Sequence, residues 1–235
     1  RKPVSWSAAA SFEMGFVRQE GWAPASWIGL AEDTRQSPLS RRLIKTAGMQ
    51  EAQALEAFPS PLFRREFETS RKVVRARAYV CGLGYYELYV NGRKIGEQVL
   101  NPAQTTYDVR AFYTVHDITS GINPGRNAVG IWLGNGFYGQ NIAFADRQLA
   151  WGSPVLICKI IIDYIDGTSE AVVSDESWKA ETGPIVFDNV YAGETYDARR
   201  ERAGWNVPGY DDFRWQKAVK VPPPCATLIG QAIPP

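Results

Sequence analysis

Short apolar stretches separated by turn residues dominate the chain from residue 62 onward. The segment KVVRARAYV alternates, with Arg75 and Arg77 on one face and Ala76 and Ala78 on the other, as a half-buried β-strand does. The continuous apolar run AVGIWLG is typical of a central strand, and PVLICKIIIDYI is the longest apolar run of the chain. These patterns predict many strands and almost no helix.

Turn signals recur between these stretches about every 8 to 12 residues, the spacing typical of β-sandwiches. Asn91-Gly92 lies between two strand-like segments, and Asp166-Gly167 follows the longest apolar run. Both dipeptides favour two-residue hairpin turns, because the central positions need positive φ. We therefore predict an all-β fold, a sandwich or a jelly roll, with one short helical insert.

The helical insert is expected between residues 31 and 58, where the strand pattern stops. EDTRQSPLSRR is polar and interrupted by proline, which predicts a loop. MQEAQALEAF is rich in helix formers, and the spacing of Met49, Ala52 and Leu55 is loosely helical. The prolines of PSP then end this expected helix.

Three parts of the chain follow from these patterns. Residues 1–58 are expected to form lead-in strands and the insert, both packing on the sandwich, and residues 59–222 form the sandwich itself. Residues 223–235, after the proline run VPPP, are expected to be an exit linker toward a further domain. The chain begins Arg-Lys-Pro without a methionine, so we expect a piece of a longer protein whose compartment stays open.

Charge and cysteine content exclude several classes of function. The net charge of +1 gives no electrostatic basis for binding nucleic acid or an anionic membrane, and no apolar run is long enough to span a bilayer. Cys81 and Cys158 lie within apolar runs, and Cys225 follows prolines. The odd number and the lack of a CxxC motif predict buried, inert thiols rather than disulfides or a zinc site.

The aromatic content suits both β-sheet proteins and sugar-binding surfaces, with eight tryptophans, eleven tyrosines and ten phenylalanines. The best binding candidate is LGNGFYGQNIAFADRQLAW, in which glycines follow an apolar strand and flat rings alternate with polar groups. A sugar needs that mixture, because rings stack on its C–H face and fixed polar groups bond its hydroxyls. The predicted sugar contacts are Asn135, Phe137, Tyr138, Asn141 and Trp151. Packing of this loop against a neighbouring domain stays open as the alternative.

The segment DNVYAGETYDARRE contains two carboxylates three residues apart, Glu194 and Asp197. In an extended chain, such residues lie about 10 Å apart and point to opposite faces. They therefore cannot both face one substrate, and we predict a structural role, with pairing to Arg199, Arg200 or Arg202. The single histidine, His116, is expected to be a strand residue without a nucleophile nearby. No catalytic residue is predicted in this chain.

Several motifs in a fixed order resemble the N-terminal β-sandwich of bacterial α-L-rhamnosidases. They are GLGYYELYVNGRKIG, LNPAQTTYD, FYTVHDIT, GRNAVGIWLGNGFYG, DYIDGTSEAVVSDESWK, GPIVFDNVYAGETYDARRE and GWNVPGYDDFRWQKA. The resemblance covers nearly the whole chain apart from residues 31–58, and it implies an antiparallel β-sandwich of jelly-roll (galactose-binding-like) type. It implies a bacterial parent enzyme that removes terminal α-L-rhamnose by inversion, whose catalytic carboxylates lie in a C-terminal (α/α)6 barrel.

The resemblance therefore implies that this chain is a non-catalytic accessory module that supports that barrel and contacts substrate. The alternative is an autonomous module that binds L-rhamnose or a similar sugar. No cofactor is expected except calcium, on which some sugar-binding modules of this family depend. Asp188-Asn189 offers the oxygen ligands that calcium prefers, and an Asx hydrogen bond at a turn is the alternative role for this pair.

Overall fold

The computed structural model describes residues 15–31, 58–139, 151–225 and 227–232. It also describes the backbone of four short strands, which are β2 (Arg41–Ile44), β3 (Gln53–Glu56), β10 (Ala143–Phe144) and β11 (Arg147–Gln148). β2 pairs with β3 and β10 pairs with β11, both in antiparallel orientation. Within the described ranges, no helix is long and apolar enough to cross a membrane.

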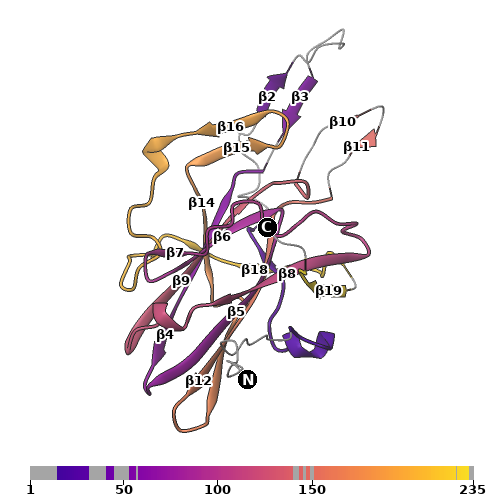
Figure 1. The fold of residues 1–235 in the computed structure, drawn as a ribbon. Helices are drawn as coiled ribbons and strands as arrows, with labels where there is room; N and C mark the ends of the chain where they lie inside the picture. Colours follow the sequence, from indigo (N-terminus) through magenta and orange to yellow (C-terminus); the bar gives the residue numbers. More distant parts are fainter. Residues whose placement is uncertain are drawn as a thin grey trace, which may run out of the picture.

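Two β-sheets form the body of the molecule (Figure 1). The first sheet contains, in order, β18 (Val219–Lys220), β1 (Ile28–Gly29), β12 (Val155–Tyr164), β5 (Val73–Leu83), β8 (Arg110–Asp117) and β19 (Thr227–Gly230), and β13 (Ser169–Val173) also pairs with β12. The second contains β17 (Gln216–Lys217), β14 (Lys179–Thr182), β4 (Pro61–Thr69), β9 (Gly125–Gly134), β6 (Tyr85–Val90) and β7 (Arg93–Ile95). Their pairings are antiparallel except that of β19 with β8.

A separate two-stranded hairpin, β15 (Ile185–Asn189) and β16 (Gly193–Tyr196), projects beyond one end of the sandwich (Figure 1). The described helices are three 3-10 turns, η1 (Gln19–Trp22), η4 (Thr119–Gly121) and η5 (Ala198–Arg200). The predicted all-β sandwich is confirmed. The predicted central position of AVGIWLG is also confirmed, because β9 lies between β4 and β6.

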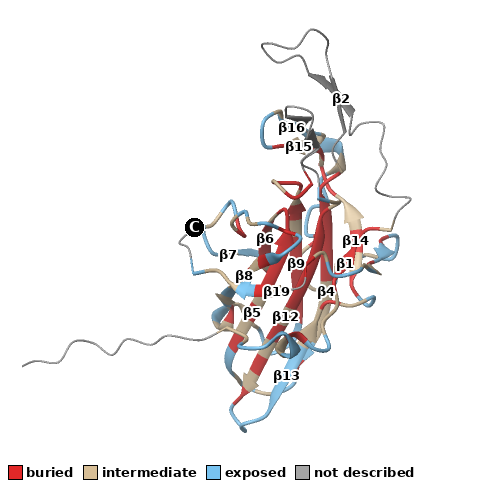
Figure 2. Cartoon of the chain, turned by 90° about the vertical axis from the view of Figure 1, so that its right-hand side faces the viewer, coloured by how far each residue is buried: buried red, intermediate tan, exposed pale blue. Residues whose placement is uncertain are grey.

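The core lies between the two sheets, because each inner strand alternates. Ala78 of β5 and Ile160 of β12 are direct partners within the first sheet and face Leu88 of β6 and Ile131 of β9 in one buried cluster. Buried residues run along the middle of both sheets in Figure 2. Each fully buried leucine or isoleucine side chain in this cluster contributes about 1.5–3 kcal/mol. The alternation in KVVRARAYV therefore predicted correctly that the face with Ala76 and Ala78 enters the core.

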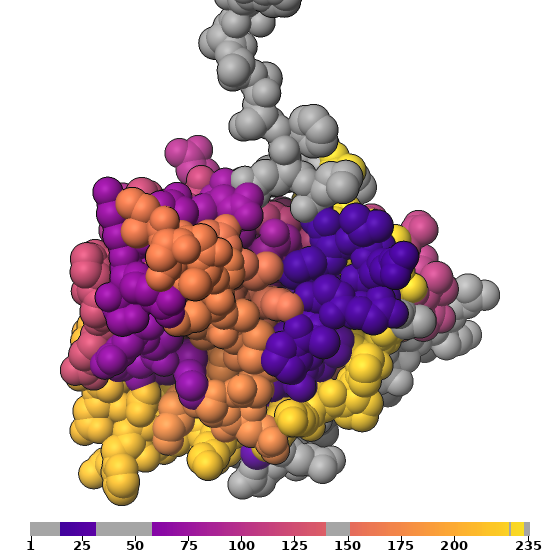
Figure 3. All heavy atoms as spheres, turned by 90° about the horizontal axis from the view of Figure 1, so that it is seen from below, coloured from indigo at the N-terminus to yellow at the C-terminus, as the bar shows by residue number. Residues whose placement is uncertain are grey.

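A second apolar cluster covers the outer face of the first sheet. Phe16 stacks on Tyr79 with ring centroids 4.2 Å apart, and Trp22 meets Tyr113 edge to face at 5.2 Å. The backbone N–H of Phe16 donates to the Tyr113 hydroxyl at 2.7 Å. Lys159 of β12 donates to the carbonyls of the lead-in segment, which lies beside this strand in Figure 3. The described residues 15–31 are thus an integral layer of the fold.

The outer face of the second sheet is covered by residues 201–215. Trp205 and Trp215 stack at 6.3 Å and pack on Leu62 of β4. Arg64 is buried beneath them and donates to the carbonyls of Trp205 and Val207. A buried guanidinium thus fastens this segment to the sheet.

Both predicted hairpins are present, and the two-residue turn is confirmed at Asn91 and Gly92, which have φ of 50° and 82° and join β6 to β7. The connection from β12 to β13 is longer than the predicted two residues, because β12 ends at Tyr164 and β13 begins at Ser169. Of its Asp-Gly pair only Gly167 has a positive φ, of 81°. The three cysteines are buried and unpaired, as predicted.

The helix predicted within residues 31–58 is wrong for the residues described there. Residues 53–56 form β3, which pairs with β2 through Leu55 opposite Arg42 and Ala54 opposite Leu43. Helix propensity is a weak preference, and backbone pairing with a second extended segment overrides it. Residues 45–52 lie outside the described part. Residues 227–230, within the expected linker, form β19 and pair with β8.

Candidate functional site

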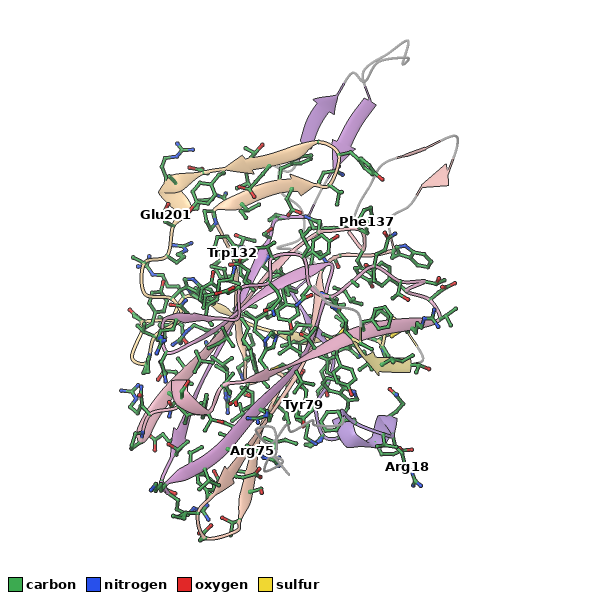
Figure 4. All side chains as sticks on the ribbon, in the orientation of Figure 1. Arg18, Arg75, Tyr79, Trp132, Phe137 and Glu201 are labelled. Atoms are coloured by element: carbon green, nitrogen blue, oxygen red, sulfur yellow. The ribbon has the colours of Figure 1, made fainter. Side chains whose placement is uncertain are left out.

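A pocket of about 270 Å³ lies at the end of the second sheet, beside the β15–β16 hairpin. Its lining comes from β6, β9, the hairpin and the residues before β4. Because β6 alternates, Tyr85 and Glu87 face outward into the pocket region while Leu88 enters the core. Trp132 of β9, the cross-strand partner of Glu87, also lines the pocket. Figure 4 shows Trp132 and Phe137 on the part of the sandwich nearest the hairpin.

Asp188 holds the hairpin to the sandwich at this pocket. Its Oδ1 accepts from the backbone N–H of Asn135 at 2.9 Å. Its Oδ2 accepts from Asn135 Nδ2 and from Ser60 Oγ, both at 2.8 Å. Burial raises the pKa of Asp188, and these hydrogen bonds oppose that rise. Asp188 is therefore occupied by donors of the fold.

Glu87 is occupied in the same way. Its carboxylate pairs with Lys94 and accepts from the Tyr89 hydroxyl. Both partners come from the second sheet, Tyr89 on β6 and Lys94 on β7, so Glu87 belongs to a local network on the sheet's outer face.

Glu194 differs from these two carboxylates. It stands opposite Asp188 in the register of the hairpin and is exposed. Burial and the charge of Asp188 raise the pKa of Glu194. Among the described residues, no donor bonds its carboxylate. Glu194 is thus a free acceptor at the rim of the pocket.

Tyr85 provides the flat surface of the pocket. Its ring meets Phe137 edge to face at 6.5 Å, and Phe137 meets Tyr191 in the same way at 6.4 Å. Burial raises the pKa of Tyr85, so its hydroxyl keeps its proton and can donate. Within the described part of the chain, that hydroxyl has no hydrogen-bond partner.

The residues predicted to contact sugar occupy different surroundings. Asn135 is fully buried and donates to Asp188 and, at 2.6 Å, to the Phe58 carbonyl. Phe137 contacts the pocket through Tyr85. Asn141 lies outside the described residues. The remaining two, Tyr138 and Trp151, both pack edge to face on buried Tyr107, at 5.3 and 5.9 Å.

Of the four described candidates, then, Asn135 and Phe137 contact residues that line the pocket, Asp188 and Tyr85 respectively, and none of the four belongs to the lining itself. Sugar contact by these residues stays a prediction. The residues that line the pocket, Tyr85, Glu87 and Glu194, were not among the predicted contacts. The alternation of YYELYV could have placed the first two on one outward face. No local signal could have shown that the hairpin lies above them.

Asn189 makes the Asx hydrogen bonds that were its alternative role. Its Oδ1 accepts from the backbone N–H groups of Tyr191 and Ala192 at 2.9 and 3.1 Å. Among the described residues, no group of three or more His, Cys, Asp or Glu side chains is placed to hold a metal ion. Calcium binding by Asp188 and Asn189 stays a prediction that these contacts do not favour.

Asp197 has the structural role predicted for it. Its carboxylate accepts from Arg199 Nε and Nη2, both at 2.8 Å, and from the Arg199 backbone N–H, which caps η5. These bonds lower the pKa of Asp197. Asp197 therefore stabilises the 3-10 turn that follows the hairpin, whereas Glu194 lines the pocket. The two carboxylates do not act as a pair.

The comparison with known families decides where this chain belongs. Residues 71–235 match the family described as the alpha-L-rhamnosidase N-terminal domain. The chain belongs to this family. An alpha-L-rhamnosidase of Formosa agariphila is 43% identical over 235 residues, which are 98% of this chain and 25% of that protein. The chain thus spans about a quarter of the length of this curated relative.

Solved structures agree with this membership. The alpha-L-rhamnosidase of Dictyoglumus thermophilum is 39% identical, with a TM-score of 0.79 over 92% of this chain and 23% of that chain. The Streptomyces avermitilis alpha-L-rhamnosidase complexed with L-rhamnose is 38% identical, with a TM-score of 0.68 over 72% of this chain and 17% of that one. The suspected relation to rhamnosidase N-terminal domains is therefore confirmed.

Proposed function

We propose that this chain is the non-catalytic accessory module of an enzyme that hydrolyses terminal α-L-rhamnosides. The observation that carries the proposal is the family match over residues 71–235, in a chain that spans about a quarter of a relative named as an alpha-L-rhamnosidase. The partner is then the catalytic (α/α)6 domain of the same parent protein, and the module supports it.

The arrangement of carboxylates supports the non-catalytic part of this proposal. An inverting glycosidase holds its two carboxyl groups about 6.5–9.5 Å apart on opposite sides of the sugar. Asp188 and Glu194 are direct cross-strand partners on one hairpin, a position that brings Cβ atoms to about 4.5–5.5 Å. The oxygens of Asp188 are also occupied by Ser60 and Asn135. This pair leaves no room for sugar and water between its members.

The proposal is tested by comparing the 235-residue chain with its full-length parent on 4-nitrophenyl α-L-rhamnoside. The parent is expected to release nitrophenol, and the isolated chain is expected to release none above the buffer rate. Turnover by the isolated chain would contradict the non-catalytic assignment. A parent that hydrolyses other glycosides but not rhamnosides would contradict the substrate assignment.

The second candidate function is autonomous binding of L-rhamnose or a similar sugar. The free Tyr85 hydroxyl and Glu194 carboxylate at one pocket favour it. Calorimetric titration with L-rhamnose tests this candidate, and heat of binding that saturates supports it. The calcium prediction is tested in the same titration, since affinity must then rise with calcium and disappear in EDTA. Saturable binding that EDTA does not change would reject calcium while keeping the binding function.

A further inference from the structure

Three residues that line the pocket beside the β15–β16 hairpin have a polar side-chain group without a partner in the described part of the chain, and one of these groups, the indole N–H of Trp132, is buried. Asp188 and Glu87 are occupied by donors from the surrounding strands, as described above. Tyr85 and Glu194, which line the same pocket, have no hydrogen-bond partner among the described residues. Of the two accessible lining residues, Tyr85 has a hydroxyl that can donate and accept, and Glu194 has a carboxylate that accepts.

The ring of Tyr85 is held in a defined orientation. Phe137 packs against it at an interplanar angle of 83°, and Tyr191 of the hairpin turn packs against Phe137 at 80°. A fixed, flat ring beside free polar groups is a surface on which the C–H face of a sugar ring can stack. Tyr85 can therefore offer stacking and a hydrogen bond at one position.

The size of the pocket limits the ligand. Sites for drug-sized ligands have volumes of about 300–1,000 Å³, and this pocket holds about 270 Å³. One monosaccharide ring is the unit of matching size, whether it is free or terminal in a longer saccharide.

Charge then selects among small ligands. The carboxylates of Glu87, Asp188 and Glu194 all line the pocket, and Lys94 neutralises only Glu87. Anionic ligands such as uronic acids and phosphates meet like charges and are rejected. A hard cation would need several free oxygen ligands, and two of these three carboxylates are occupied. A neutral polyhydroxylated ligand can donate to Glu194, in a charge-assisted bond, and accept from Tyr85.

We propose that this pocket binds one ring of a neutral saccharide, with Tyr85 and Glu194 as the residues that recognise it. The proposal deepens the second candidate function above and rests on it for the ligand class. It differs from the sequence prediction, because the recognition residues lie on β6 and β16 rather than in the glycine-rich loop after β9.

The experiment uses L-rhamnose and a matched pair of sugars, of which one has a neutral hydroxymethyl group and the other a carboxylate at C6. The 15N-labelled 235-residue chain is titrated with D-galactose, with D-galacturonate at the same concentrations, and with L-rhamnose. The neutral sugars are expected to shift amide resonances of residues 85–87 and 193–195 with millimolar saturation. Galacturonate is expected to bind at least tenfold more weakly. Equal binding of galacturonate, or shifts confined to residues around Trp151, would overturn the proposal.

Three variants complete the test. Glu194→Gln removes the charged acceptor and is expected to weaken sugar binding roughly tenfold or more, and Tyr85→Phe removes only a hydroxyl and is expected to weaken it about three- to tenfold. Glu201→Gln is the matched control, because this carboxylate binds Tyr196 outside the pocket and should leave affinity unchanged. Glu194 is exposed and unpartnered, so its variant should keep the wild-type spectrum. Unchanged affinity in both pocket variants would overturn the proposal.

The outcomes separate this proposal from the accessory-module proposal. If none of the sugars binds to the 235-residue chain while the full-length parent hydrolyses rhamnosides, the pocket proposal is refuted and the accessory-module proposal stands. Sugar binding that depends on Glu194, with a parent inactive on rhamnosides, keeps the pocket and refutes the assigned activity.

Discussion

Asp188 and Asn135 are joined by two hydrogen bonds that attach the β15–β16 hairpin to the end of β9. The backbone N–H and the side-chain Nδ2 of Asn135 donate to different oxygens of the same carboxylate, at 2.9 and 2.8 Å. Asn135 is fully buried, and Asp188 is mostly buried. This relationship explains why the glycine-rich loop and the DNVYAGETYD segment lie together, and it positions the pocket.

Removal of this carboxylate should destabilise the fold. Asp188→Ala leaves two buried donors of Asn135 and the Ser60 hydroxyl without their acceptor, so the free energy of unfolding should fall by about 2–4 kcal/mol. Urea denaturation measures this change. Glu176→Ala is the control, because Glu176 has only an exposed ion pair with Lys220 at 3.6 Å and should change stability by less than about 0.5 kcal/mol. Equal effects of both variants would contradict the bridging role.

Arg64 should be required for the segment over the second sheet. Its guanidinium is buried, pairs with Glu66 and Asp212, and donates to two carbonyls of residues 205–207. Arg64→Met removes the ion pair to Asp212 and leaves the carbonyls of Trp205 and Val207 without this donor, and should lower the free energy of unfolding by about 3–5 kcal/mol. Hydrogen exchange should show faster exchange at the amides of Trp205 and Val207.

Arg126→Met provides the matched control for that variant. Arg126 also pairs with Glu66, at 2.8 Å, but most of its side chain is exposed, so the loss should stay below about 1 kcal/mol. If the amides of Trp205 and Val207 exchanged as slowly in Arg64→Met as in the wild type, the anchoring role of Arg64 would be refuted.

His116 should make the protein less stable in mild acid. The Nε2 atom of His116 is hydrogen-bonded to the Tyr86 hydroxyl at 2.7 Å. Burial lowers the pKa of His116 to about 4 from an ordinary 6.5. The unfolded chain therefore binds more protons between these values, so stability falls as pH falls from 6.5 toward 4. Over that window the loss attributable to His116 is about 3 kcal/mol at most.

The test compares wild type with His116→Gln in urea denaturation at pH 7.5 and pH 4.5. The variant should lose less stability between these two conditions. Burial raises the pKa of Asp188, which acts with the opposite sign, because stability then falls as pH rises. Because wild type and variant both contain Asp188, subtracting one change in stability from the other removes the contribution of Asp188. Parallel pH profiles of variant and wild type would show that His116 does not titrate as stated.

Gly84 should not tolerate a side chain. A Cβ atom at this position would lie 1.9 Å from the backbone oxygen of Asn135, and backbone atoms cannot rotate away as a side chain can. Gly84→Ala should therefore lower the free energy of unfolding by about 3 kcal/mol or more. Gly121→Ala is the control, since its nearest neighbour, Val90, would be 3.5 Å away, and it should stay within about 0.5 kcal/mol of wild type. A thermal unfolding midpoint shared by both variants would contradict the packing described here.

The parts of the fold that could be predicted depend on contacts within a few residues. The alternation around Ala76 and Ala78 identifies a core face, and Asn91-Gly92 identifies a hairpin, because strand periodicity and turn geometry are local properties. Local patterns failed at residues 53–56, where helix formers adopt a strand because a second extended segment pairs with them. They also gave no sign that Asn135, which lies in a loop rich in glycines and polar groups, would be fully buried.

The candidate site depends on contacts between distant segments. Sequence patterns alone were sufficient to predict the all-β class, the strand faces, the Asn91-Gly92 turn and the buried thiols, and to show the resemblance to rhamnosidase N-terminal domains. They could not show that Glu194 and Tyr85 line one pocket, because the two belong to segments far apart in the chain. Hydrogen bonds from Asn135 and Ser60 to Asp188 hold the hairpin to the residues after β9 and before β4, and such long-range pairing leaves no periodic pattern in the sequence.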